Sequence, residues 1–188
     1  ELFRSPDPFA PADAARGRDI RVVEALDLGQ RRVRDELADQ PELRAALLAS
    51  ISDVYASLEQ HDQAIELREE ALAIEDGLYG PRSPQVTASL RALGLQYAAT
   101  GDLERADSLL ERQLKLATDT RSTTAAELAV ARIASGLHEA RRGDFERSRQ
   151  LLLQGVATLR DEPASHPHDL VNALIALEQQ RSFAGAPI

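Results

Sequence analysis

The sequence predicts an all-α protein, a solenoid of antiparallel helix pairs with about eight helices. The first observation is an internal repeat: three segments align without gaps at an offset of 42 residues, around Ser52, Gly94 and Gly136. The second is the spacing of apolar residues at i, i+3, i+4 and i+7 within each copy. The third is that Val, Ile and Thr never alternate with polar residues over a strand length.

Each copy is expected to form two helices joined by a tight turn. Gly101 and Gly143 can adopt the left-handed conformation that ends a helix, and the aspartates that follow them can cap the next one. Ser83 precedes Pro84 as a helix start, and Thr124 with Glu127 fits a capping box. The two helices of a copy can approach closely only where their side chains are small. We therefore expect twelve positions to pack the hairpins: Ser52, Tyr55, Ala64, Ala71, Gly94, Tyr97, Gly101, Ala106, Gly136, Gly143, Ser148 and Gly155.

The same register extends beyond the three copies. Residues 22–37 correspond to a second helix without its first, and residues 170–180 correspond to a first helix without its second. Residues 1–19 carry three prolines and no apolar periodicity, which predicts an extended lead-in. The helical domain is expected over residues 20–181, followed by a tail over residues 182–188. Because the chain begins without Met, we expect it to be a piece of a longer protein.

Composition narrows the classes of function. Aromatic residues make up only 4% and Cys is absent, so the core is expected to be aliphatic, without disulfides or thiolate ligands. The net charge of −9 argues against a nucleic-acid partner or an anionic membrane surface. No apolar run reaches the ~20 residues of a membrane span. The sequence also lacks a glycine-rich phosphate loop, GxSxG, HExxH, HRD and DFG, so no catalytic residue and no cofactor are expected.

The pattern small-x-x-Tyr-x-x-x-Gly-Asp-x-x-x-Ala, which Gly94, Tyr97, Gly101, Asp102 and Ala106 carry most fully, resembles the tetratricopeptide repeat. The 42-residue period is similar to the long variant found in kinesin light chains and in many bacterial signalling proteins. This resemblance implies a right-handed superhelix over about residues 20–180. The chain departs from the kinesin-light-chain pattern where Arg91 and Ala92 follow Ser-Leu in place of asparagines, and where Glu139 replaces the repeat tyrosine.

A narrower resemblance covers the N-terminal third. Residues 2–8, 15–17, 23–29 and 36–43 are similar to the segment that opens the repeat region of bacterial serine/threonine protein kinases. In that family a kinase domain is followed by a membrane helix and then by repeats. The resemblance implies that this chain is the sensor or scaffold part of a membrane-anchored kinase, on a side of the membrane that the sequence leaves open.

Two functions are consistent with the sequence. The first is an interaction module whose concave face, lined by first helices, binds a peptide or partner protein. The matching positions for such a groove are Asp53, Arg91, Leu95, Ile133, Leu137, Arg141 and Gln179. Arg91 and Arg141 would bind a carboxylate of the ligand, or would simply pair with neighbouring acidic residues of this chain. The second function is self-association into a homo-oligomer through the apolar edges of the terminal half-repeats.

Three of the four histidines are weak candidates for a site, and His138 is assigned no role. His166 and His168 with Asp169 offer two His and one Asp, which do not close a tetrahedral metal site, and Ser165-His166-Pro167 reads as an ordinary loop before a helix. We therefore expect no metal. His61 is in register with Leu103 and Phe145, so it is expected to be a packing residue.

Overall fold

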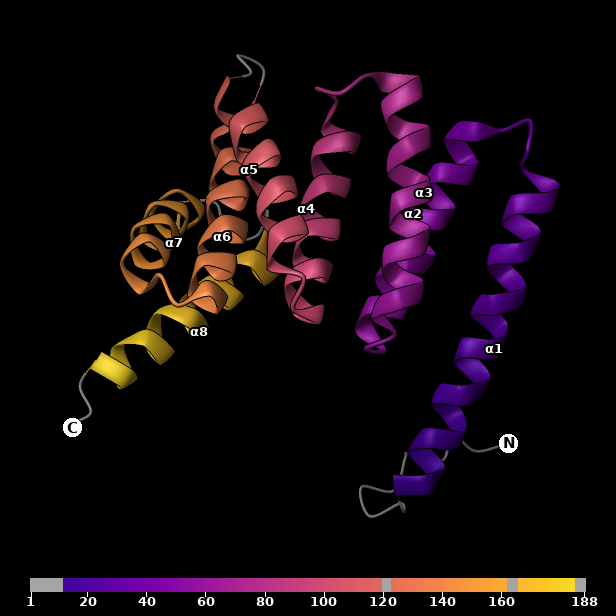
Figure 1. Ribbon diagram of the computed structural model, residues 1–188, viewed down its shortest axis with the longest axis horizontal. Coiled ribbons are helices and arrows are strands. Elements are labelled where there is room, and N and C mark those ends of the chain that lie inside the picture. Colours follow the sequence, from indigo (N-terminus) through magenta and orange to yellow (C-terminus); the bar gives the residue numbers. More distant parts are fainter. Residues whose placement is uncertain (1–11, 120–122, 162–165, 185–188) are drawn as a thin grey trace.

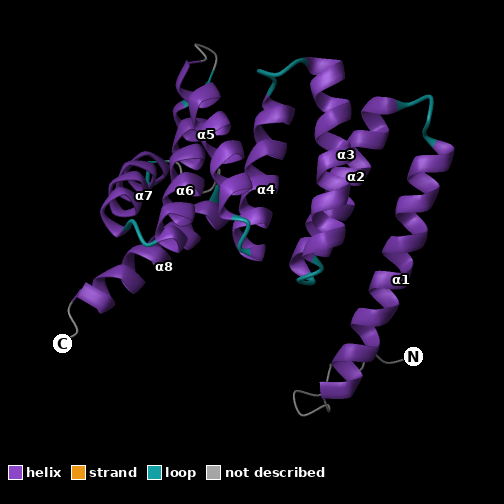
Figure 2. Ribbon diagram, viewed as in Figure 1, coloured by secondary structure: helices purple, strands orange, loops and turns teal. Residues whose placement is uncertain are grey.

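The computed structural model describes residues 12–119, 123–161 and 166–184 of the chain, and this part is entirely helical apart from turns (Figures 1 and 2). Eight helices follow one another: α1 (Ala12–Glu36), α2 (Pro41–Ser57), α3 (His61–Tyr79), α4 (Pro84–Thr100), α5 (Leu103–Asp119), α6 (Ala125–Arg142), α7 (Phe145–Leu159) and α8 (Pro167–Ala184). They pack in consecutive pairs. The predicted all-α array of helix pairs is confirmed for these residues.

The helix ends follow from local sequence. Gly101 and Gly143 have φ angles of 86° and 87°, in the left-handed region that glycine adopts without steric cost. Thr124 forms the complete capping box with Glu127. The first repeat has Glu59 at the corresponding position, and it also adopts a positive φ, of 58°. A tight turn of one geometry therefore joins the helices of all three hairpins, even where the glycine is missing.

The two helices of each hairpin meet where side chains are small. A Cβ at Gly94 would lie 2.7 Å from Cγ of Leu110, and one at Gly136 would lie 2.9 Å from Cγ of Leu152. In the first repeat, the Ser52 hydroxyl donates a hydrogen bond of 2.7 Å to the backbone oxygen of Ala64. The hairpins therefore close around the positions in register with Ser52.

Tyrosines join one repeat to the next. The Tyr55 hydroxyl donates to Asp27 Oδ1 of α1 at 2.6 Å, and the Tyr97 hydroxyl donates to Glu69 Oε1 of α3 at 2.5 Å. Burial and the neighbouring carboxylate raise the pKa of Tyr97. At the third interface, Glu139 stands in the tyrosine register and is buried, but it pairs with Arg147 of its own hairpin at 3.0 Å. Asp107 of α5 instead contacts His138 Nε2 of α6 at 2.7 Å and Arg142 Nη1 at 3.2 Å. Phenol–carboxylate contacts thus hold the first two interfaces, and ion pairs replace them at the third.

The two sets of helices play different parts in the stack. Among the first helices, α4 contacts α6 and α6 contacts α8, whereas no comparable contact joins α2 to α4, α3 to α5 or α5 to α7 within the described chain. From α4 onward, the first helices are therefore the closer-spaced set. This arrangement makes their side the inner face of the curve.

The N-terminal helix starts earlier than the sequence suggested. α1 begins at Ala12, inside the segment expected to be an extended lead-in. The last proline of that segment is Pro11, and no proline follows before Pro41, so nothing in the covalent chain interrupts a helix from Ala12 onward. At the other end, α8 continues to Ala184, into the expected tail. Residues 1–11 of the lead-in expected over residues 1–19, and the last four residues of the tail, lie outside the described residues.

None of the described helices is both long enough and apolar enough to cross a lipid bilayer.

Glu75 of α3 gives a testable electrostatic prediction. Its carboxylate is buried and one oxygen has no hydrogen-bond partner among the described residues. Burial raises its pKa, against the opposing effects of the Ser89 hydroxyl and the Arg68 guanidinium. A folded-state pKa above the unfolded value means that this group costs stability at neutral pH and stops doing so as the pH falls. We expect Glu75→Gln to raise the free energy of unfolding at pH 7 by about 1 kcal/mol.

The pH dependence supplies the control for this substitution. Urea melts at pH 7 and near pH 5 should show the gain shrinking as the solution approaches 4.5, the ordinary pKa of a glutamic acid. A gain that is the same at both pH values would contradict the assignment of the cost to ionised Glu75.

Candidate functional site

The residues predicted to line the inner groove do not form one continuous surface. Asp53 on α2, Arg141 on α6 and Gln179 on α8 are exposed, while Leu95 of α4 and Leu137 of α6 are half-buried. Leu137 packs against the core cluster of the third repeat. Asp53 accepts a hydrogen bond from the Arg68 guanidinium, so an arginine of the same hairpin already holds this carboxylate.

Ile133 occupies a different environment from the one expected. It is fully buried, and its Cγ1 lies 2.5 Å from where a Cβ on Gly155 would be. Its register position therefore faces the second helix of its own hairpin, where it contributes to the core. We leave Ile133 out of the candidate surface for this reason.

Arg91 pairs across the array. Its Nη1 lies 3.1 Å from Asp169 Oδ1, at the start of α8, and both side chains are largely covered. The partner is 78 positions away in sequence, so the local pattern gave no sign of it. This ion pair joins the second repeat to the last helix at the rim of a pocket.

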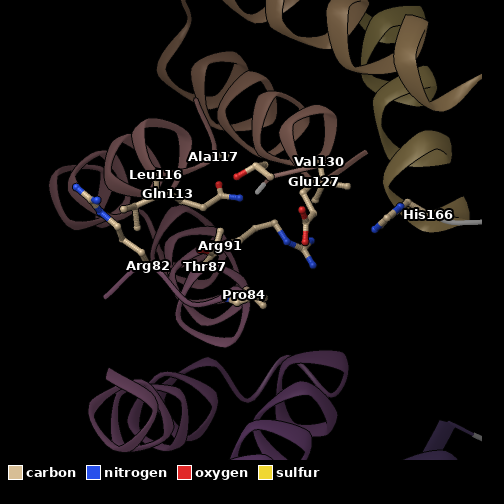
Figure 3. A pocket seen from close by; sticks show the side chains of 12 residues that line it. Arg82, Pro84, Thr87, Arg91, Gln113, Leu116, Ala117, Glu127, Val130 and His166 are labelled. Atoms are coloured by element: carbon tan, nitrogen blue, oxygen red, sulfur yellow. The ribbon is translucent and has the colours of Figure 1, made fainter. Parts of the chain in front are cut away.

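The pocket lies between α4, α5 and α6, near the beginning of α8, and has a volume of about 320 Å³ (Figure 3). That volume is at the small end of the range for ligand sites in proteins. Its wall combines apolar and polar side chains. The lining residues are Arg82, Pro84, Thr87, Ala88, Arg91, Gln113, Leu116, Ala117, Thr123, Glu127, Val130 and His166.

Gln113 is the most unusual residue of this wall. It is 2% exposed, and its Oε1 has no hydrogen-bond partner among the described residues. The same register position holds Ala71 in the first repeat and Gly155 in the third. A buried, unsatisfied amide oxygen costs about 1–3 kcal/mol, which the small residues of the other repeats avoid. Sequence reasoning missed Gln113, although a polar residue where the other copies have Ala and Gly was the available signal.

Charge is distributed unevenly around the pocket. Arg82, at one end, is exposed and has no hydrogen bond or ion pair in the part of the chain that is described. Glu127 and Arg91 lie together toward the other end, with His166 beyond them (Figure 3). The Glu127 carboxylate also accepts the backbone N–H of Thr124, 2.7 Å away. The Arg82 end is therefore the cationic one.

The histidines gather no metal site in the described ranges, where no three His, Cys, Asp or Glu side chains are close enough to hold an ion. Asp169, considered from the sequence as a ligand beside His166 and His168, instead faces Arg91. His61 hydrogen-bonds Gln96 at 2.9 Å through its Nδ1, which places it at the contact between the first and second repeats.

Paired helices, an inner face of first helices and a pocket between repeats define this chain as a helical-repeat protein. More specifically, residues 43–119 match the family model of the tetratricopeptide repeat. No curated protein matches the sequence. The match covers about two fifths of the chain and lies over α2 to α5, the first two hairpins of the described array.

Known structures share the fold at low sequence identity. The crystal structure of BtubC (BKLC) from P. vanneervenii aligns with a TM-score of 0.69 at 19% identity, covering 92% of this chain and 68% of that one. A Podosopora anserina protein assigned as a kinesin light chain, with nearly identical TPR-like repeats, aligns with a TM-score of 0.63 at 22% identity, covering 92% and 84%. A second crystal structure of that Podosopora anserina protein gives 0.64 at 21% identity, covering 91% and 81%.

Proposed function

We propose that this chain is an interaction module that binds a segment of a partner protein along the inner face formed by α2, α4, α6 and α8. The observation that carries the proposal is the closer spacing of α4, α6 and α8, with a pocket opening where α4 and α6 meet. Curved helical arrays use such concave surfaces to bind extended or helical peptides. Of the residues predicted for this face, Arg141 and Gln179 are exposed and Leu95 is half-buried, whereas Asp53 and Arg91 are paired with Arg68 and Asp169 and Leu137 packs against the core.

The parent protein is a separate part of the proposal. We propose that this module is the regulatory repeat region of a bacterial serine/threonine kinase. Its support is the resemblance of the N-terminal third of the sequence, of which residues 1–11 lie outside the described chain. A partner segment bound on the inner face would then report to, or recruit a substrate for, the kinase domain of the same polypeptide.

A selection experiment tests the binding function. A random dodecapeptide library displayed on phage is selected against the immobilised module, and the affinities of the enriched peptides are measured by calorimetry. We expect enriched peptides to bind with micromolar dissociation constants, equivalent to about −8 kcal/mol. A module that is folded by circular dichroism but enriches no peptide would contradict the proposal.

A second function, self-association, is favoured by the exposed face of α8. Val171, Leu174 and Ile175 are 52%, 39% and 50% exposed and lie together on one side of this helix. Ile175 is in register with Ile133, which in its own hairpin packs against Gly155. The face of α8 that a second helix would cover is therefore apolar and open.

The opposite end of the array offers a matching surface, so we propose a second copy as the occupant. α1 is in register with the second helices, and Gly29 corresponds to Gly155. A Cβ at Gly29 would meet nothing within 4 Å, so this position of α1 has room for a side chain. Ile175 of one copy against Gly29 of another would repeat the Ile133–Gly155 contact, in a head-to-tail arrangement.

Light scattering over a range of concentrations separates the two functions. Self-association predicts a mass that grows with concentration and falls back to that of the monomer in Ile175→Asp, with exposed Leu153→Asp on α7 as the matched control. A monomer at every concentration would contradict the second function and leave the first unaffected.

A further inference from the structure

We infer that the pocket between α4, α5 and α6 is the subsite where an extended, acidic peptide segment is held, with Gln113 accepting a hydrogen bond from the peptide's backbone. This inference rests on the proposed binding function and names the subsite and the chemistry of its ligand. The occupant is a stretch of polypeptide that offers a backbone N–H, a small apolar side chain and a carboxylate.

The first observation is that burying the unsatisfied amide oxygen of Gln113 lowers the stability of the fold. Its buried Oε1 accepts no hydrogen bond from the described residues, and the repeats on either side fold with Ala71 and Gly155 at this position. The fold therefore has no need of an amide here. An acceptor without a donor inside a pocket is satisfied when a ligand supplies the donor, and the missing hydrogen bond then favours binding. A backbone N–H is the donor that every extended peptide presents.

The second step is the polarity of the neighbouring position. In the first and third hairpins, the residues that face Ala71 and Gly155 in register are Ala49 and Ile133, and both are apolar. In the second hairpin this residue is Arg91, held by Asp169. The middle repeat alone thus places two polar side chains at a contact that its neighbours fill with apolar ones. The departure coincides with the pocket.

The third step is the direction of the ligand. Arg82 is a cation without a partner among the described residues at one end of the pocket, whereas Glu127 lies at the other end beside Arg91 (Figure 3). A carboxylate on the ligand is attracted to the Arg82 end and repelled by Glu127 at the far end. Between the two ends, Leu116, Ala117 and Val130 form an apolar wall.

Three variants test this subsite with the peptides that the dodecapeptide selection enriches on the parent protein. Gln113→Ala installs the residue of the first repeat and removes the acceptor. Arg82→Ala removes the cation, and Arg149→Ala removes an exposed arginine on α7, away from the pocket, as the matched control. Calorimetry measures the affinities, and thermal melts check that each variant folds.

We expect enriched peptides to carry an acidic residue beside an apolar one. Gln113→Ala should weaken their binding about tenfold, while melting at the same temperature as the parent or higher. Arg82→Ala should weaken acidic peptides and leave their alanine-substituted versions unchanged. Arg149→Ala should bind like the parent.

The contrary results are distinguishable. If peptides bind but Gln113→Ala and Arg82→Ala keep the parent affinity, the subsite is overturned and the binding function survives. If Gln113→Ala melts well below the parent, Gln113 stabilises the fold, and its presence no longer indicates a ligand. If no peptide is enriched, both the function and the subsite are overturned.

Discussion

Gly94→Leu is expected to lower the free energy of unfolding by about 3 kcal/mol, the upper end of the usual cost of overpacking a core. A single Cβ at this position would already lie 2.7 Å from Cγ of Leu110 and 2.8 Å from its Cδ2. Leu110 is 1% exposed, so its side chain is enclosed by neighbouring residues. The added side chain therefore forces α4 and α5 apart. Denaturant melts followed by circular dichroism measure the loss.

Gly77→Ala is the control for glycine replacement itself. Gly77 is an exposed position within α3, and a Cβ there meets no atom within 4 Å. Alanine should raise stability by about 0.5–1 kcal/mol, because it restricts the unfolded chain and suits a helix. If Gly94→Leu melted like the parent protein, the packing of the central hairpin described above would be wrong.

The second large effect concerns Arg68, which occupies the register of Leu110 and Leu152. In those two repeats the leucine lies where a Cβ on the facing glycine would be, but here the residue in the glycine register is Ser52, which carries a Cβ. Arg68 is 6% exposed and donates a hydrogen bond of 2.7 Å to the backbone oxygen of Ala49. We expect Arg68→Leu to cost about 2 kcal/mol, although leucine is the residue that the other repeats use.

A double-mutant cycle isolates this contact. Ser52→Gly alone should also destabilise, because it removes the hydrogen bond to Ala64 and places a glycine within α2. Together, Ser52→Gly and Arg68→Leu rebuild the glycine–leucine pair of the other hairpins. The double variant should be more stable than the sum of the single effects by about 1–2 kcal/mol. Additive effects would contradict the coupling of the two positions.

The fold could be predicted because the same helix-hairpin pattern occurs three times in the sequence. A hairpin repeated at a fixed offset gives the helix pairing, and Gly101, Gly143 and Thr124 mark helix ends by local backbone chemistry. The start of α1 could not be predicted in the same way. Residues 12–21 have no counterpart in the other copies, so only the absence of proline after Pro11 indicated that the helix could extend.

The candidate site could be predicted from the sequence less completely than the fold. Register identifies equivalent positions, but it does not say whether the position faces the groove or the facing helix, so Ile133 was expected on the surface and is buried. The Arg91–Asp169 pair depends on how α8 crosses the array, which no local pattern encodes. Gln113 could have been found by searching for positions where one copy departs from the others in polarity.

The inner face is tested most directly by methyl NMR spectroscopy with an enriched dodecapeptide. Ala88, Ala117 and Val130 line the pocket, whereas Leu78 of α3 and Leu153 of α7 are exposed on second helices outside it. Titration of the peptide should shift the methyl resonances of the first three residues and leave those of Leu78 and Leu153 in place. Shifts confined to Leu78 and Leu153, with the pocket methyls unmoved, would contradict binding on the inner face.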